Sequence, residues 1–142
     1  MTNKDSKKRV IFICRNNSGR SQMAEAIFRH LFKNKYEVHS AGTDPRPINP
    51  LTFKILKEIG IDASTQKSKD LQKFQGQKFD VVITLCDDKD EACPLFLTGE
   101  KYIHRNFKDP GTFKDEESLK LEFFRKVRDE IYQWIEQELR LD

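Results

Sequence analysis

The sequence predicts an α/β fold: a single domain in which a small four-stranded parallel sheet is flanked by helices on both faces. Short apolar segments alternate along the chain with amphipathic segments of helical periodicity, as in parallel α/β sheets. The segment DVVITLC at 80–86 is rich in branched apolar residues, which is typical of strands buried on both faces. The chain has 142 residues, enough to bury a core as one unit, so we expect one domain over residues 1–142.

The first half of the chain is expected to contain two strands and two helices. Runs of apolar or alternating side chains predict the strands. A broad apolar stripe predicts the first helix, which would pack on the sheet. Asn49 followed by Pro50 is a start signal for the second helix, which stops at Gly60. These elements are expected at 10–14 (strand), 21–33 (helix), 36–40 (strand) and 50–59 (helix).

The second half is less regular. Residues 64–77 are polar except for Leu71 and Phe74, so we expect a loop with one short helix beginning near Ser68. Apolar residues recur every three or four positions near the C-terminus, which predicts a long amphipathic closing helix. The remaining elements are expected at 80–86 (strand), 101–104 (strand), 107–115 (loop) and 118 to the end (helix).

Composition excludes several classes of protein. Hydrophobic residues make up 37% and charged residues 35%, a polar but foldable balance. The net charge of +3 favours small anions, but no dense basic tract suggests a nucleic-acid partner. No apolar run approaches membrane-spanning length and the first ten residues lack a signal region, so we expect a cytoplasmic protein without membrane contact.

A cysteine and an arginine frame the most informative segment. Cys14 ends the first expected strand, and Arg20 opens the next helix. The N–H groups of the intervening turn and of the helix N-terminus would converge on one point and favour negative charge there. Arg20 could grip an oxyanion in bidentate fashion, and the same field favours a nucleophilic thiolate at Cys14. This predicts an anion-binding loop of Arg15, Asn16, Asn17, Ser18, Gly19, Arg20 and Ser21.

Cys14, Cys86 and Cys93 are the three cysteines of the chain, and several roles are open to them. Cys14 could be purely structural. A zinc site would lack any Cys-x2-Cys pair, so we expect no metal. An inert core role suits Cys93 poorly, because it lies among Asp, Glu and Pro. A redox role uses all three: a thiolate that holds a reducible oxyanion is attacked at sulfur by a second thiol, and a third thiol exchanges into the resulting disulfide.

The sequence resembles the thioredoxin-coupled arsenate reductases, which share the low-molecular-weight tyrosine phosphatase fold. The resemblance runs from about Val10 to the final helix. It is carried by CRNNSGRSQMAEA at 14–26, SAG at 40–42, NP at 49–50, GID at 60–62, TLCDDKDEACP at 84–94 and DP at 109–110.

The resemblance implies a reaction for each cysteine. Cys14 would attack arsenate while Arg20 and the loop amides hold its oxygens, and Asp109 would donate a proton to the leaving oxygen. Cys86 would attack the Cys14 adduct and release arsenite, and Cys93 would then displace Cys14. The resulting Cys86–Cys93 disulfide would be reduced by thioredoxin. From the residues alone, Asp109 before proline is equally an ordinary turn opener, and Ser18 or Ser21 could simply cap a helix.

The implied partners follow from this chemistry. We expect arsenate as substrate, phosphate or sulfate as competing oxyanions, thioredoxin as external reductant, no bound cofactor, and a monomer. The alternative is a low-molecular-weight protein tyrosine phosphatase that uses Cys14, Arg20 and Asp109. A third possibility is a non-catalytic anion or redox sensor.

The chain departs from the family pattern at several positions. Gly19 stands where a further cysteine is often found, Arg15 adds a positive charge near the mouth of the loop, and HRNFKDPG at 104–111 lacks the usual tryptophan. Some members bind potassium through residues corresponding to Asn17, Glu25 and Ser40 and to an acidic residue that is Lys69 here. We therefore expect the Lys69 ammonium to replace the ion.

Overall fold

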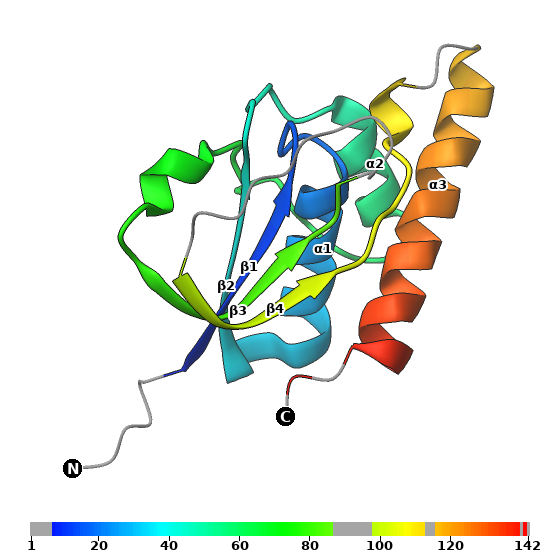
Figure 1. The fold of residues 1–142 in the computed structure, drawn as a ribbon. Helices are drawn as coiled ribbons and strands as arrows, with labels where there is room; N and C mark the ends of the chain where they lie inside the picture. Colours follow the sequence, from blue (N-terminus) through cyan, green and yellow to red (C-terminus); the bar gives the residue numbers. More distant parts are fainter. Residues whose placement is uncertain (1–6, 87–97, 113–115, 140, 142) are drawn as a thin grey trace.

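The fold is built on one parallel sheet at whose carboxyl edge the cysteine loop lies (Figure 1). The computed structural model describes residues 7–86, 98–112, 116–139 and 141. Its four strands are all parallel and lie in the order β2-β1-β3-β4, which confirms the expected sheet. The strands are β1 (Lys8–Cys14), β2 (Tyr36–Gly42), β3 (Lys78–Thr84) and β4 (Thr98–His104).

The strand boundaries differ from the predicted ones. β3 begins two residues earlier than expected and β4 three, because backbone pairing continues through polar residues such as Lys78, which pairs with Thr98. β3 ends at Thr84 and not at Cys86. After Thr84 the ladder to β4 stops, since the Leu85 carbonyl accepts a bond from Phe107 N, which lies beyond the end of β4. Cys86 therefore follows the strand by two residues.

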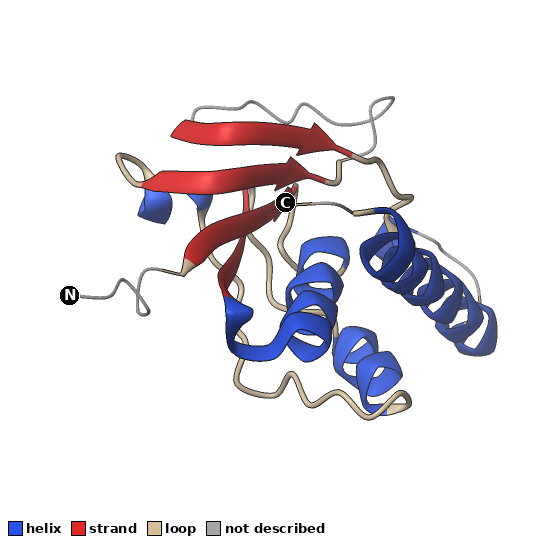
Figure 2. Cartoon of the chain, turned by 90° about the horizontal axis from the view of Figure 1, so that it is seen from below, coloured by secondary structure: helices blue, strands red, loops and turns tan. Residues whose placement is uncertain are grey.

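All three α-helices cover one face of the sheet (Figure 2). Alternate residues of β1, among them Val10 and Phe12, point into this core together with Phe28 of the first helix and Phe124 of the last. The helices are α1 (Arg20–Phe32), α2 (Pro50–Lys57) and α3 (Glu117–Gln133), and α3 runs on into a π-helical turn, η4 (Trp134–Glu138).

The other face carries a smaller core. Ile11, Ile13, Ala41, Phe79 and Val82 pack there against the 3-10 turn η2 (Leu71–Phe74), which Figure 1 shows in green, away from α3. Helical segments thus lie on both faces as predicted, but unequally, because the polar segment 64–77 offers only two apolar anchors. The short helix begins at Leu71 and not near Ser68, since Asp70 caps it by accepting from Gln72 N.

Two further 3-10 turns complete the described secondary structure. They are η1 (Lys33–Lys35), which follows α1, and η3 (Pro110–Thr112), which lies within the segment predicted as a loop. Within the described residues, none of the helices combines the length and apolar content needed to cross a membrane.

The main core should depend strongly on Phe28. This side chain is 1% exposed, and its ring contacts Phe12, Phe32 and Tyr36 at centroid distances of 4.6–5.6 Å. Phe28→Ala leaves a cavity, so it should lower the free energy of unfolding by about 3–5 kcal/mol, measured by urea denaturation. Leu119→Ala, on an exposed face of α3, is the control and should change it by less than about 0.5 kcal/mol. Equal losses of unfolding free energy in the two variants would contradict this role of Phe28.

Candidate active site

The thiol of Cys14 lies inside the loop that joins β1 to α1. Cys14 is the last residue of β1 and is 1% exposed. Its Sγ accepts a hydrogen bond from Asn17 N at 3.2 Å and lies 2.8 Å from the hydroxyl of Ser21. A thiolate at this position would therefore accept from both groups, which is the arrangement that stabilises a nucleophilic sulfur.

The loop rests directly on the end of β2. A side chain at Gly42 would place its Cβ 2.6 Å from the Arg15 carbonyl oxygen and 2.9 Å from Asn17 N, closer than real side chains come. Just after Gly42, Asp44 N donates to the Arg15 carbonyl at 2.8 Å, and Arg46 N donates to the Asn16 carbonyl at 2.9 Å. The loop is thus held by the segment that follows β2, and only glycine fits beneath it.

Asn17 fixes the loop from within. It is fully buried and has a left-handed φ of 49°, a conformation that asparagine tolerates better than most residues. Its amide nitrogen donates to Ser21 Oγ at 2.7 Å and Ser40 Oγ at 2.9 Å, while its oxygen accepts from Lys69 N at 2.7 Å and Gln22 Nε2 at 2.9 Å. The loop is therefore tied to α1, to β2 and to the segment around Lys69.

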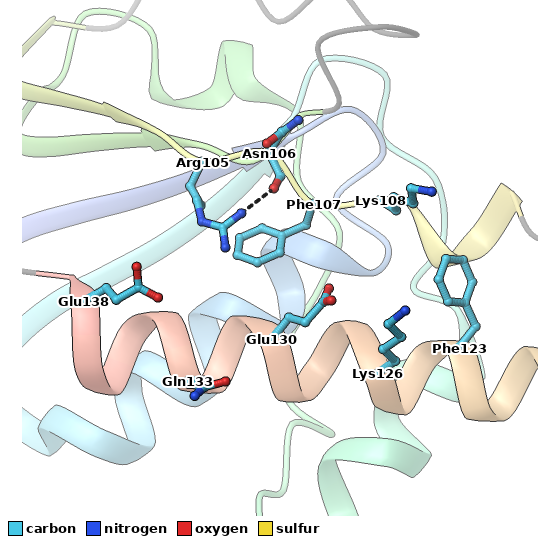
Figure 3. Close-up of a pocket in the computed structure, with 9 residues that line it drawn as sticks. All are labelled: Arg105, Asn106, Phe107, Lys108, Phe123, Lys126, Glu130, Gln133 and Glu138. Carbon is cyan, nitrogen blue, oxygen red and sulfur yellow. Dashed lines mark hydrogen bonds between the residues drawn. The ribbon is translucent and has the colours of Figure 1, made fainter.

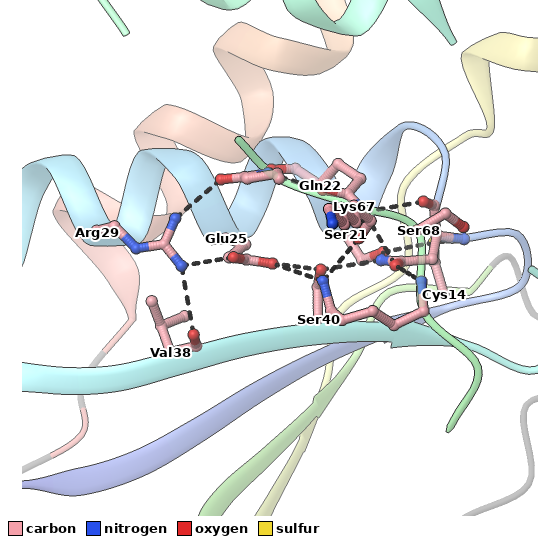
Figure 4. Close-up of polar contacts among 12 residues, drawn as sticks. Cys14, Ser21, Gln22, Glu25, Arg29, Val38, Ser40, Lys67 and Ser68 are labelled. Atoms are coloured by element: carbon pink, nitrogen blue, oxygen red, sulfur yellow. Dashed lines mark hydrogen bonds and ion pairs between the residues drawn. The ribbon is translucent and has the colours of Figure 1, made fainter. Parts of the chain in front are cut away.

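A chain of buried polar contacts continues from Ser40 away from the thiol (Figure 4). Ser40 donates to Glu25, which also pairs with Arg29. The Lys69 ammonium lies 3.6 Å from Glu25 Oε1 and donates to the Lys67 carbonyl at 2.7 Å. Burial lowers the pKa of Lys69, and the negative charge of Glu25 opposes that shift. Lys69 thus lies in the same network as Asn17, Glu25 and Ser40.

Arg20 is buried beneath the loop and is held there by protein atoms. Its side chain is 1% exposed, and Nη1 donates to the carbonyls of Phe107 at 3.2 Å and Leu85 at 3.4 Å. Nη2 lies 3.5 Å from Asp109 Oδ2. Asp109 also accepts from Gly111 N at 2.9 Å, which is the turn geometry expected of Asp before proline.

Cys14, Arg20 and Asp109 meet at a small cavity of about 160 Å³. Because Arg20 begins α1 and Gly19 directly precedes it, the positive end of that helix dipole borders the cavity and favours an anion there. The cavity is of a size for a small tetrahedral oxyanion. Its lining consists of Cys14, Asn16, Ser18, Gly19, Arg20, Arg46, Asn49, Asp109 and Gly111.

The other members of the predicted loop have different places. Arg15 is exposed, and Asn17 and Ser21 are buried outside the cavity lining, where they hold the thiol. Ser18 joins the loop to α2, because its hydroxyl accepts from Asn49 N at 3.0 Å and its carbonyl from Thr52 Oγ1 at 2.9 Å. Sequence reasoning missed Arg46 and Asn49 as lining residues, since nothing local distinguishes an arginine in a proline-containing loop.

Of the other two cysteines, the structure describes Cys86. Cys86 is 1% exposed and disulfide-bonded, whereas Cys14 is free. Cys86 follows β3, whose Thr84 pairs with Ile13 immediately before Cys14, so the segments that carry Cys14 and Cys86 leave neighbouring strands. Cys93 lies outside the described residues. Among the residues that are described, no group of three or more His, Cys, Asp or Glu side chains could hold a metal ion.

A larger cavity of about 420 Å³ lies behind the site, between segment 105–108 and α3 (Figure 3). Its lining mixes charges of both signs, from Arg105, Lys108, Lys126, Glu130 and Glu138, and contains no cysteine. Phe107 separates the two cavities: its carbonyl accepts from Arg20, and its ring packs edge-on against Trp134 at 5.7 Å. The larger cavity therefore borders Phe107, which holds Arg20, and does not reach the thiol of Cys14.

The contact between the loop and Gly42 can be tested with Gly42→Ala. The added Cβ must push Arg15 and Asn17 away, so phosphate affinity measured by calorimetry should fall at least about tenfold, with a stability loss of about 1–3 kcal/mol. Gly76→Ala is the control, because Gly76 has φ +85° and open space around it. It should cost about 1–2 kcal/mol in stability and leave phosphate affinity unchanged. Unchanged phosphate affinity in Gly42→Ala would contradict the close contact.

Comparison with known proteins identifies the relatives of this chain. The family described as "Low molecular weight phosphotyrosine protein phosphatase" matches residues 9–140. The arsenate reductase of Halalkalibacterium halodurans is 39% identical over 126 residues, which cover 89% of this chain and 91% of that protein. The arsenate reductase of Bacillus subtilis is 39% identical over 124 residues, 87% of this chain and 89% of that protein.

A solved structure described as "An arsenate reductase in oxidized state" superposes with a TM-score of 0.76 at 33% identity, covering 91% of this chain and 94% of that one. Another, in "the phosphate binding state", has a TM-score of 0.73 with the same identity and coverage. The chain therefore belongs to the low molecular weight phosphotyrosine protein phosphatase family and is homologous to the arsenate reductases within it.

Proposed function

We propose that this protein reduces arsenate to arsenite, with Cys14 as the nucleophile. The observation that carries the proposal is a free thiol in an oxyanion-sized cavity while a second, buried cysteine follows the neighbouring strand and is disulfide-bonded. Phosphate hydrolysis has no use for the second cysteine. The names of the homologues support the same reaction.

The first step uses the cavity. Arsenate binds with its oxygens on Arg20 and the loop N–H groups, and the Cys14 thiolate attacks arsenic. Asn17 N and Ser21 Oγ stabilise the thiolate before attack, through the contacts of 3.2 and 2.8 Å. Asp109, next to Arg20 at the cavity edge, donates the proton with which one oxygen leaves as water.

The second step moves two electrons from sulfur to arsenic. The Cys86 thiolate attacks Cys14 Sγ, the S–As bond breaks, and its electron pair leaves with arsenic as arsenite. Cys93 then attacks Cys86 and releases Cys14, and thioredoxin reduces the final Cys86–Cys93 disulfide. A disulfide-bonded Cys86 beside a free Cys14 is the pairing such a relay would reach.

The Lys69 ammonium would take the place of a potassium ion beside the loop. It lies 3.6 Å from the buried carboxylate of Glu25, which Ser40 connects to Asn17. A fixed positive charge at this position compensates Glu25 and keeps Ser40 bonded to Asn17, whose backbone N–H contacts the thiol. No external cation is then needed.

A phosphatase is the second candidate, because the family is named for that activity. It would use Cys14, Arg20 and Asp109 in the same cavity to form and hydrolyse a phosphocysteine. The two reactions share their first step, so residual hydrolysis of an aryl phosphate is compatible with arsenate reduction. The relay cysteines distinguish them.

Cysteine variants should separate the steps. With arsenate, thioredoxin, thioredoxin reductase and NADPH, Cys14→Ser should form no arsenite, because the nucleophile is lost. Cys93→Ser should form at most one arsenite per enzyme, since the disulfide cannot be passed outward. Arsenite is quantified directly and NADPH consumption followed in parallel. Repeated turnover by Cys93→Ser would contradict the relay, and aryl phosphate hydrolysis without arsenate reduction would favour the phosphatase.

The role of Lys69 predicts insensitivity to potassium. Arsenate reduction by the unmodified protein should be equal in potassium and sodium chloride at the same ionic strength. Lys69→Ala leaves the Glu25 charge less compensated, so its turnover should fall and then recover partly with potassium. Lys101→Ala, on the exposed strand β4, is the control and should not respond to either ion. Clear activation of the unmodified protein by potassium would contradict this role.

A further inference from the structure

We propose that Arg46 is a second oxyanion-binding residue, whose guanidinium at the mouth of the cavity contacts the oxygens that Arg20 does not hold. Arg46 lines the cavity together with Cys14, Arg20 and Asp109. Its backbone N–H donates to the Asn16 carbonyl at 2.9 Å, so the residue is attached to the anion loop itself. The assignment of arsenate as the anion rests on the proposed function, but the binding role does not.

The charge balance of the cavity calls for another cation. A dianionic oxyanion approaches the negatively charged Cys14 thiolate, while Arg20 contributes one positive charge. Arg20 is also engaged by the protein, because Nη1 donates to two carbonyls and Nη2 lies 3.5 Å from Asp109 Oδ2. Like charges at such distances in a buried site oppose binding strongly. A second guanidinium at the mouth compensates this repulsion.

The other nearby cations are differently placed. Lys69 lies against Glu25 on the far side of the loop and does not line the cavity. Arg15 is exposed and also absent from the lining. Arg46 is therefore the one lysine or arginine besides Arg20 among the described residues that line this cavity.

Arg46 is also free to respond to an anion. Its side chain is 66% exposed, and its ion pair with Asp44 is long, at 3.4 Å, between two exposed groups. Exposed pairs of this kind are weak, so the guanidinium can exchange Asp44 for a bound oxyanion. Asp44 is held in place because its N–H donates to the Arg15 carbonyl at 2.8 Å. Asp44 therefore competes with the anion for Arg46.

Calorimetric titration of the reduced protein with inorganic phosphate tests the assignment. Arg46→Gln should raise the phosphate Kd about tenfold, the loss expected for one charge-assisted contact, and Arg46→Lys should raise it less. The KM for arsenate should rise to a similar extent, while kcat should stay within about twofold of the unmodified protein, because binding and not chemistry is affected. Arg125 of α3 forms an ion pair with Glu58 outside the cavity lining. Arg125→Gln makes the same charge change there and should leave the phosphate Kd and the arsenate KM unchanged.

A double-variant cycle tests the competition. Asp44→Asn should lower the phosphate Kd about two- to threefold when Arg46 is present and should have no such effect in Arg46→Gln. A phosphate Kd within twofold of the unmodified protein for Arg46→Gln, or the same loss in Arg125→Gln, would overturn the assignment. So would an equal effect of Asp44→Asn in both backgrounds. Weakened phosphate binding in a protein that reduces no arsenate would leave the role of Arg46 intact and remove only the proposed function.

Discussion

The side-chain amide of Asn17 is the constraint on which the site depends. Both of its donor positions and its oxygen are used, toward Ser21, Ser40, Gln22 and the backbone of Lys69. A buried amide that is satisfied in this way allows only one orientation, and fully satisfied buried networks are rigid. No buried side-chain nitrogen or oxygen of the described residues lacks a partner. The loop is therefore already shaped before any anion arrives.

This rigidity explains how a small protein can hold several charged groups in one place. The cavity collects a thiol, a carboxylate and two arginines where β1 ends and α1 begins. None of these side chains is oriented by the anion alone, because Arg20 and Asp109 have protein partners of their own. Dipoles fixed in advance stabilise developing charge without reorganisation during the reaction.

Local patterns predicted the parts of the structure that depend on neighbouring residues. The apolar run before Cys14 and the amphipathic stripe after Arg20 were sufficient to place strand, loop and helix. The strands extend beyond their apolar runs, because hydrogen bonds between backbones do not require apolar side chains. The crowding of all three α-helices on one face also could not be read from the sequence, since each amphipathic stripe specifies burial but not the partner.

The residues that sequence reasoning missed act across long separations. Gly42 supports a loop that begins at Cys14, and Arg46 reaches the same cavity from the segment after β2. Lys69 was placed beside Glu25 only through family resemblance, because the two are 44 positions apart and neither belongs to a local motif. Such contacts follow from the parallel crossovers, which return distant segments to one edge of the sheet.

Phe107 joins this edge to the end of the chain. Its carbonyl supports Arg20, and its ring lies against Trp134, the first residue of the π-helical turn that ends the last helix. The position of the guanidinium thus depends on packing at the C-terminus, more than a hundred residues from Cys14 in sequence. Natural variation in that last turn is therefore a route by which relatives of this protein could tune how firmly they hold an anion, without altering any residue that touches it.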